Sequence, residues 1–355
     1  MKKVFLIIPT LRQGGAERVM SELANDWVYK NCEVNLILLN SDRDIFYKID
    51  ERVNIIPLEF VYTNRMDYVL NQVKIFFKLR KLIIEKKPDF LLSFMTKYNI
   101  LSIFASGFTK TRTYVSDRSS ANTKLPFLQN ILRMISYSFA DGIIAQTHTA
   151  SRIIKKQVFN KNITVIENPI KKIHQHPEIV REKIILNVGR LVWEKGQTYL
   201  LEAFVQTTCN DDWKLVLLGE GPERQKLEML IETLNLTGKV VLNGQTKDVD
   251  YWLNKASVFA FSSVSEGFPN ALIEAMGAGL ACVSFDCDSG PADIINNEEN
   301  GFLVPLKDTR CFAEKLTLLM NDEGLRMKMG SEAKKINERL SLENISNMFF
   351  TFCNH

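Results

Sequence analysis

Short runs of apolar, often β-branched residues alternate along this chain with longer stretches in which apolar positions recur every three to four residues. The short runs predict buried strands, and the longer stretches predict helices that cover them. In the first half the predicted strands span residues 4–8, 33–39, 53–57, 90–94, 112–116, 142–145 and 163–166. Helical stretches between them include residues 15–30 and 67–86. This alternation is typical of parallel α/β units.

A second series follows an interruption at residues 171–183, where His174, His176 and Pro177 break the periodicity. Its predicted strands span residues 184–188, 214–218, 240–242, 258–261 and 281–285, and its helices include 197–207, 222–234, 270–277, 309–320 and 323–339. Because each series carries a glycine loop after its first strand, we predict two Rossmann-like domains, residues 1–175 and 176–338. The remaining residues, 339–355, contain a helical stretch that we expect to pack back on the first domain.

Cysteine usage and hydropathy exclude several classes of protein. The six cysteines are scattered, with neither a CxxC pair nor histidines at ligand spacing, which disfavours a zinc site or a disulfide framework and fits a reducing compartment. The apolar run at residues 4–8 ends at Pro9 and suits a first strand better than a signal peptide. No segment reaches about 20 uninterrupted apolar residues, so we expect no membrane span and a cytoplasmic location.

The charge is distributed unevenly. Residues 1–175 hold 27 Lys and Arg against 15 Asp and Glu, a net +12, whereas residues 176–355 hold 18 against 26, a net −8. Opposite balances indicate domains with different tasks. The basic half could face an anionic lipid surface, a phosphorylated acceptor or nucleic acid, or could simply be a solvated lysine-rich surface.

The first candidate site is the turn at Gly14 and Gly15, between the first strand and the first helix. Glycines allow backbone N–H groups to approach an anion, and the helix N-terminus adds partial positive charge. The turn lacks the G-x-G-x-x-G spacing, and Asn40 stands where a dinucleotide fold places an acidic residue, which disfavours an oxidoreductase. An ordinary tight turn remains the alternative.

The second candidate site follows the first strand of the second series. Arg190 leaves that strand and Lys195 comes five residues later in the same loop. Two cations at the carboxyl end of a parallel strand suit a diphosphate group, although a solvated basic loop would look the same in the sequence.

The most specific signal is a pair of glutamates. Glu266 lies in a predicted loop, Gly267, Phe268 and Pro269 follow it, and Glu274 lies eight positions later in the helix predicted over 270–277. Carboxylates accept hydrogen bonds from sugar hydroxyls, and the start of the helix favours phosphate. Both acids could therefore serve one sugar nucleotide.

This segment resembles the E-x7-E motif of retaining glycosyltransferases with the GT-B fold, specifically glycosyltransferase family 4. Other parts of the chain agree with the motifs of that family. They are the Gly14-Gly15 turn, Gly189-Arg190 with Lys195, Gly219-Glu220-Gly221-Pro222, Asn168-Pro169, Ser289-Gly290-Pro291 and residues 300–304. The resemblance covers nearly the whole chain and implies an α/β protein with two Rossmann-like domains facing each other across a cleft.

The resemblance also implies roles for these residues. Glu274 would hold the ribose hydroxyls and Glu266 would contact the donor sugar, while Arg190 and Lys195 would neutralise the departing diphosphate. Backbone groups would orient the sugar and phosphate at Gly14, Gly15, Gly267, Phe268, Asn270 and Ala271. The cation pair takes the place of a metal, and Asp286-Cys287-Asp288 lies in a loop that this family does not use for metal, so no metal cofactor is expected.

The chain departs from the family pattern at Arg118. Many members place a histidine near the donor sugar at this point, but an arginine cannot act as a base at neutral pH. Arg118 is therefore predicted to be a catalytic residue that binds phosphate or the acceptor.

Two stretches, residues 64–87 and 124–139, combine an apolar stripe with basic residues. They could attach to an anionic membrane or to a lipid-linked acceptor, or could be ordinary helices that turn their apolar face to a sheet. We therefore predict transfer of a hexose or N-acetylhexosamine from a UDP-linked donor to a lipid-linked glycan at the inner face of the cytoplasmic membrane, with no nucleic-acid partner. A soluble acceptor and a non-catalytic nucleotide-binding module are the alternatives.

Overall fold

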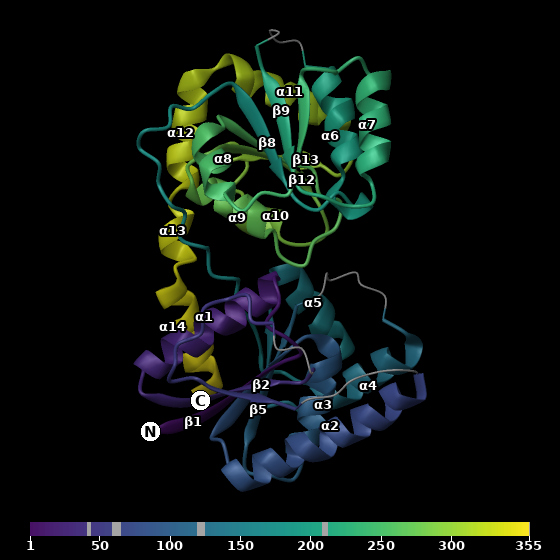
Figure 1. The fold of residues 1–355 in the computed structure, drawn as a ribbon, viewed down its shortest axis with the longest axis vertical. Coiled ribbons are helices and arrows are strands. Elements are labelled where there is room, and N and C mark those ends of the chain that lie inside the picture. The colour runs from purple at the N-terminus through teal and green to yellow at the C-terminus, as the bar shows by residue number, and fades with distance from the viewer. Residues whose placement is uncertain (41–43, 59–64, 119–124, 208–211, 355) are drawn as a thin grey trace. The chain divides into compact units, whose positions relative to one another are not determined.

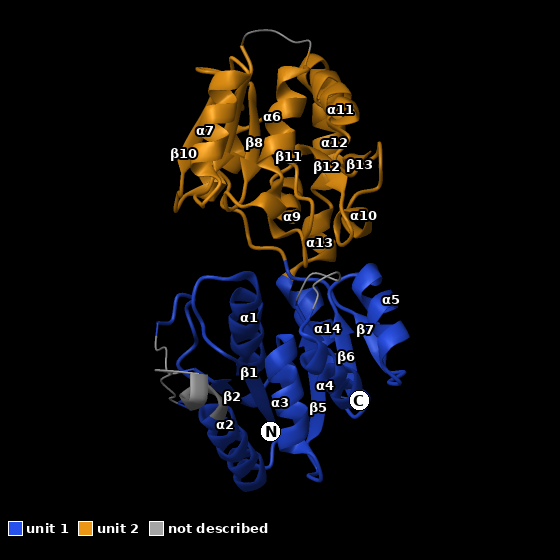
Figure 2. Ribbon diagram, turned by 90° about the vertical axis from the view of Figure 1, so that its right-hand side faces the viewer, with its two compact units in different colours: residues 1–169, 342–355 blue, residues 170–341 orange. Residues whose placement is uncertain are grey.

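The computed structural model describes residues 1–40, 44–58, 65–118, 125–207 and 212–354. The chain divides into two compact units, shown in different colours in Figure 2. Unit 1 comprises Met1–Pro169 and Leu342–His355, and unit 2 comprises Ile170–Ser341. The chain passes from one unit to the other after residues 169 and 341, whereas the predicted boundaries follow residues 175 and 338.

Unit 1 is built on a seven-stranded, wholly parallel sheet (Figure 1). Its strands are β1 (Lys2–Ile8), β2 (Cys32–Leu38), β3 (Asn54–Pro57), β4 (Phe90–Phe94), β5 (Arg112–Asp117), β6 (Gly142–Ala145) and β7 (Ile163–Val165). Its helices are α1 (Gly15–Tyr29), α2 (Arg65–Lys86), α3 (Thr96–Ser106), α4 (Phe127–Tyr137), α5 (His148–Gln157) and α14 (Leu342–Asn354). The strand order β3-β2-β1-β4-β5-β6-β7 reverses direction between β1 and β4.

The central strands of unit 1 are apolar on both faces because helices cover both sides of the sheet. Residues Val4 through Ile8 are completely buried. On α2, Ile75, Leu79 and Ile83 recur every fourth residue and join the core, which is the ordinary arrangement of a helix on a sheet. The last helix of the chain, α14, packs against α1 and β4.

Unit 2 repeats the architecture with six parallel strands in the order β10-β9-β8-β11-β12-β13. The strands are β8 (Ile184–Val188), β9 (Lys214–Leu218), β10 (Val240–Gly244), β11 (Val258–Phe261), β12 (Ala281–Asp286) and β13 (Phe302–Pro305). The helices are η1 (Trp193–Lys195), α6 (Gln197–Val205), α7 (Arg224–Thr233), α8 (Val249–Lys255), α9 (Asn270–Gly277), α10 (Pro291–Ile294), α11 (Thr309–Asn321), α12 (Glu323–Ala333) and α13 (Ile336–Arg339). The order reverses between β8 and β11.

The two parallel sheets confirm the predicted pair of Rossmann-like domains. One expectation is wrong: the helix predicted over 323–339 is divided into α12 and α13. Backbone bonds from Lys335 and Asn337 reach back three residues instead of four, which tightens the chain at the junction. The tighter turn allows the Asn337 amide to donate to the Gly277 carbonyl at 2.9 Å, at the end of α9.

Candidate functional site

Three of the predicted site residues of unit 2 lie in the loops that follow the carboxyl ends of two neighbouring strands. The loop after β8 carries Arg190 and Lys195, and the loop after β11 carries Glu266. These two strands flank the point where the strand order reverses, which is where open parallel sheets bind ligands.

Hydrogen bonds to backbone carbonyls join the two loops. The Val264 N–H donates to the Glu194 carbonyl at 2.8 Å, and the Ser262 hydroxyl donates to the Lys195 carbonyl at 2.9 Å. The loops approach so closely at Gly196 that a Cβ atom there would lie 2.1 Å from the Ser262 carbonyl oxygen. Gly196 also has φ +63°, which glycine adopts without strain. Only glycine therefore fits at position 196, directly after Lys195, without a clash or backbone strain.

The turn after β9 supports the same loop from the other side. The Leu191 N–H donates to the Glu220 carbonyl at 2.9 Å. Cβ atoms on Gly219 and Gly221 would lie 2.0 Å from the Gly189 carbonyl oxygen and 2.3 Å from that of Leu191. The Gly-Glu-Gly-Pro sequence is therefore needed for close packing beneath Arg190.

Lys195 and Glu266 form an ion pair. The Nζ and Oε1 atoms are 2.6 Å apart, and the two side chains are only 23% and 9% exposed. Because both side chains are largely buried, water cannot solvate either charge well. Removing one partner would therefore leave the other as an uncompensated buried charge. Burial raises the pKa of the Cys287 thiol, in the loop after β12, to about 12. The negative charge of Glu266 adds to this rise.

Arg190 is in a different situation from Lys195. Its carbonyl accepts a bond from the Gln197 amide at 3.1 Å, which fixes the backbone. The residue is exposed, and its guanidinium makes no hydrogen bond or ion pair with any residue that the structure describes. Arg190 is thus a free cation close in the chain to a paired one.

Helix α9 carries the rest of the predicted donor site. Asn270 is its first residue, Ala271 the second, and Glu274 lies in its second turn, half-buried. Phe268 is buried just before the helix, after Gly267. A Cβ atom on Gly290 would lie 2.5 Å from Cδ of Pro269, so the Ser289-Gly290-Pro291 loop packs against the start of α9.

The turn at Gly14 and Gly15 lies in unit 1, where α1 begins. The Tyr47 hydroxyl holds the turn by donating to the Gly14 carbonyl at 2.8 Å and accepting from the Gly14 N–H at 3.1 Å. Gly15 is exposed at the start of the helix. The sequence offered no signal for Tyr47, which comes from a segment 33 residues further along the chain.

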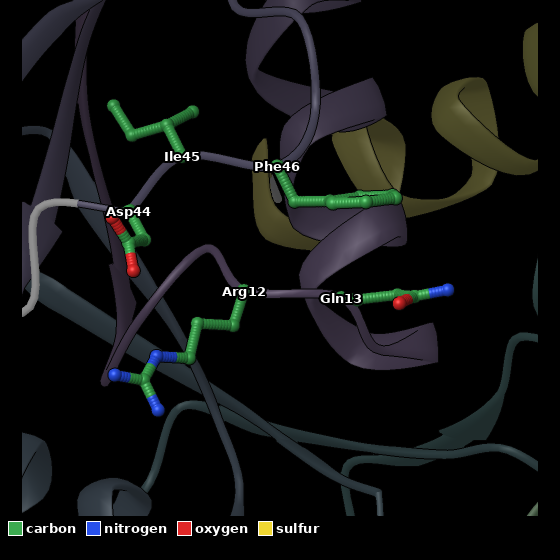
Figure 3. A pocket seen from close by; sticks show the side chains of 5 residues that line it. All are labelled: Arg12, Gln13, Asp44, Ile45 and Phe46. Atoms are coloured by element: carbon green, nitrogen blue, oxygen red, sulfur yellow. The ribbon is translucent and has the colours of Figure 1, made fainter.

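An open hollow of about 790 Å³ lies beside this turn (Figure 3). Its walls come from two segments joined by a bond from the Phe46 N–H to the Leu11 carbonyl. The lining residues are Arg12, Gln13, Asp44, Ile45 and Phe46. Sequence reasoning missed this feature, since an isolated Arg-Gln or Asp-Ile dipeptide carries no pattern.

Arg118 lies at the end of β5 in unit 1. Its guanidinium stacks 3.9 Å from the centroid of the Phe94 ring and donates to the Asn168 side chain. Burial lowers the pKa of Arg118 to about 9, which leaves it charged at neutral pH. Its Nε and Nη2 atoms are buried without a hydrogen-bond partner among the described residues. Arg118 thus has unused hydrogen-bonding capacity, and its described contacts are structural.

The predicted site residues fall into two sets. Unit 2 holds Arg190, Lys195, Glu266, the start of α9 and Glu274, and it brings Lys195 and Glu266 into direct contact. Unit 1 holds Gly14, Gly15 and Arg118. Within the described residues, no group of three His, Cys, Asp or Glu side chains is arranged to hold a metal ion. None of the described helices is long and apolar enough to cross a bilayer.

Two family models match successive parts of the chain. "Glycosyltransferase Family 4" matches residues 13–172, and "Glycosyl transferases group 1" matches residues 169–336. The two matches meet close to the division between units 1 and 2.

Similar proteins have been named in bacteria. A Campylobacter jejuni α-1,4-N-acetyl-D-galactosaminyltransferase that acts on a GalNAc-containing glycan linked to diphospho-undecaprenol is 31% identical over 94% of this chain and 93% of its own. A second C. jejuni enzyme, an N-acetylgalactosamine-N,N'-diacetylbacillosaminyl-diphospho-undecaprenol 4-α-N-acetylgalactosaminyltransferase, is 29% identical over 94% of each chain. Among solved structures, Anabaena HepE in complex with UDP shares the fold with a TM-score of 0.81, at 18% identity over 99% of both chains. The chain therefore belongs to glycosyltransferase family 4 and is a glycosyltransferase with the two Rossmann-like domains of the GT-B fold.

Proposed function

We propose that this enzyme transfers a hexose or N-acetylhexosamine, with retention at the anomeric carbon, from a UDP-linked donor to a lipid-linked glycan in surface-polysaccharide or glycan biosynthesis. The names of its relatives in C. jejuni support the lipid-linked acceptor, and the UDP bound in a protein of the same fold supports the nucleotide. The observation that carries the proposal is the Lys195–Glu266 pair at the strand reversal of unit 2.

The reaction forms a bond between an acceptor oxygen and the anomeric carbon and breaks the bond from that carbon to the diphosphate. The acceptor proton passes to the departing phosphate. Negative charge develops on the leaving group, so a cation fixed in advance lowers the barrier. Lys195 is such a cation, because Glu266 and the Gly196 turn hold it in place. Arg190 adds an exposed guanidinium, whose planar donors match phosphate oxygens.

The pairing also defines the role of Glu266. A carboxylate oxygen that accepts a 2.6 Å hydrogen bond from an ammonium group is a weaker nucleophile, since its lone pair is engaged by the N–H donor. This supports attack by the acceptor on the face from which the diphosphate leaves, with no covalent sugar–enzyme intermediate. Glu266 contacts the donor sugar and orients Lys195, and Glu274 holds the ribose hydroxyls.

We also propose that the reaction needs no divalent metal. Lys195 and Arg190 are two positive charges in one short loop, and they supply the compensation that Mg²⁺ or Mn²⁺ would give. Transfer in excess EDTA should equal transfer in Mg²⁺, and an enzyme that is inactive in EDTA and restored by Mn²⁺ would contradict this part of the proposal.

The acceptor is assigned to unit 1. Arg12 and Asp44 line the open hollow beside the Gly14 turn, so its lining is charged and polar, which suits sugar hydroxyls and phosphate. Unit 1 also carries most of the basic excess, which suits a diphosphate-linked glycan at the surface of an anionic membrane.

The test is a transfer assay with purified protein, a panel of UDP-sugars and a polyprenyl-diphosphate glycan, in EDTA. Proton NMR of the product gives the anomeric configuration, which should match that of the donor. Asp44→Asn should raise the KM for acceptor and leave the KM for donor unchanged. Transfer from no donor, or a product of inverted configuration, would refute the proposed reaction.

A further inference from the structure

Helix α4 buries a polar face and exposes its large apolar side chains. Its buried residues are Arg133, Ser136 and Tyr137. Its outer face carries the large apolar side chains, with Phe127 82%, Leu128 68% and Ile135 51% exposed. Leu132, Met134 and Phe139 are exposed as well. The arrangement reverses the usual rule that a helix on a sheet hides its apolar stripe.

Polar contacts hold α4 in this orientation. Arg133 pairs with Asp117 at the end of β5 at 3.4 Å, and both side chains are about nine-tenths buried. Asp117 also accepts from the Thr96 hydroxyl at 2.8 Å, and Tyr137 accepts from the Asn99 amide at 2.9 Å. Rotating the helix to bury its apolar face would break these bonds, because residues on opposite sides cannot both face inward.

The exposed apolar face extends beyond α4. The Phe159 N–H donates to the Ser138 hydroxyl at 3.2 Å, so the turn after α5 lies beside the end of α4, and the Phe159 side chain is 93% exposed. We define the α4 patch as Phe127, Leu128, Leu132, Met134, Ile135, Phe139 and Phe159. Helix α4 itself packs against α3 (Figure 1).

The charged residues around the α4 patch are mainly basic. Residues 125–166 contain one acid, Asp141, and five bases, of which Arg133 is buried against Asp117. Lys155, Lys156 and Lys161 are exposed in the segment that carries Phe159. Apolar side chains next to exposed lysines match the interface of an anionic bilayer, where the rings enter the headgroup layer and the lysines stay among phosphates. A two-fold dimer through this patch would instead place lysines against lysines.

We propose that the α4 patch inserts into the surface of an anionic membrane and holds unit 1 at the level of its acceptor. The inference rests on the proposed lipid-linked acceptor. It assigns membrane contact to α4, which turns its whole apolar face outward. Helix α2 buries Ile75, Leu79 and Ile83 against the sheet and exposes only its other apolar residues, which include Val73 and Phe77.

The experiment compares wild-type protein with Phe127→Ser/Leu128→Ser and with the matched control Phe108→Ser. Phe108 is a fully exposed phenylalanine of the same unit, in the turn between α3 and β5 and not part of the α4 patch. Flotation with phosphatidylglycerol vesicles should show binding by wild type and control and about a tenfold or greater loss for the double variant. Phosphatidylcholine vesicles should bind all three proteins weakly.

Two further readouts keep the outcomes distinct. Transfer to a water-soluble, short-chain diphosphate-linked acceptor should be equal in all three proteins, whereas transfer to an acceptor embedded in vesicles should fall in the double variant alone. Equal vesicle binding by double variant and wild type, absence of wild-type binding, or wild-type dimers that dissociate in the double variant by light scattering would overturn the proposal. Absence of wild-type transfer to every acceptor would instead overturn the proposed function.

Discussion

At the scale of single residues, the site is built from one paired and one unpaired cation. Lys195 is fixed by Glu266 in a largely buried contact, whereas Arg190 is exposed and makes no such bond among the described residues. The same two residue types in one loop therefore have different consequences when they are removed. Substitutions can separate the contribution of each cation to the stability of the fold from its proposed contribution to catalysis, the stabilisation of negative charge on the leaving group.

Removing Lys195 alone should cost more stability than removing the pair. Lys195→Met leaves Glu266 charged and buried, which we expect to cost about 3 kcal/mol of unfolding free energy. The double variant Lys195→Met/Glu266→Leu should recover most of that loss, while both variants lose transfer by at least about a hundredfold. Urea unfolding and turnover measure the two effects. A double variant less stable than Lys195→Met would show that the pair itself stabilises the fold.

Arg190→Ala should lower activity without changing stability. An exposed side chain with no partner contributes within about 0.5 kcal/mol to folding, so the melting temperature should stay constant. If Arg190 binds the diphosphate as proposed, its loss should reduce kcat/KM by about tenfold to a hundredfold, and Arg190→Lys should restore only part of it. Unchanged kinetics in Arg190→Ala would remove this residue from the donor site.

At the scale of elements, glycine turns rather than helices or strands determine how the site loops fit together. Gly196, Gly219 and Gly221 each place backbone where a Cβ atom would collide with a neighbouring carbonyl. The loops after β8, β9 and β11 therefore form one packed layer, and the position of Lys195 depends on it.

Gly196→Ala tests that dependence against Gly238→Ala. Both glycines have positive φ, +63° and +82°, so both substitutions carry the same kind of backbone strain, about 1 kcal/mol. Only at Gly196 is there a carbonyl oxygen in the way, because a Cβ on Gly238 would have nothing within 4 Å. We expect Gly196→Ala to lose at least about 2 kcal/mol of stability and most activity, and Gly238→Ala to keep full activity. Equal losses in urea unfolding would contradict the packing argument.

At the scale of the whole molecule, the C-terminal helix α14 packs into unit 1, which the N-terminal part of the chain forms. Trp27 of α1 donates to the Ser346 hydroxyl of α14 at 3.0 Å and meets the Phe350 ring edge-on at 5.7 Å. Phe349 is fully buried beside Phe94 of β4. Unit 1 thus depends on residues more than 300 positions apart.

Phe349→Ala should destabilise the protein far more than the neighbouring substitution Met348→Ala. Phe349 is completely buried, so its truncation leaves a cavity and should cost about 3–5 kcal/mol. Met348 is 46% exposed and should cost less than about 1 kcal/mol. Thermal unfolding of the full chain measures both. Similar melting temperatures for the two variants would mean that α14 contributes little to the core of unit 1.

Much of the fold follows from local pattern. The strands at residues 90–94, 142–145, 184–188, 214–218 and 258–261 have the predicted bounds, since a short buried run between polar turns has few other solutions. The placement of Arg190, Lys195 and Glu266 after strands could likewise be predicted, because each lies in the loop that follows an apolar run. The prediction of one continuous helix over residues 323–339 was wrong, because the apolar periodicity carries no information about the contact between Asn337 and Gly277.

Sequence alone determined the two α/β series, the loops that carry the charged residues and the family, because these are encoded in neighbouring positions. Tertiary structure decided the partners: Lys195 meets Glu266 across 71 positions only because β8 and β11 are adjacent in the sheet. It also decided that α4 turns its apolar side outward, since that orientation depends on Asp117 and Asn99 in other elements. Periodicity specifies that a helix has two faces, and only the groups packed against it determine which face is buried.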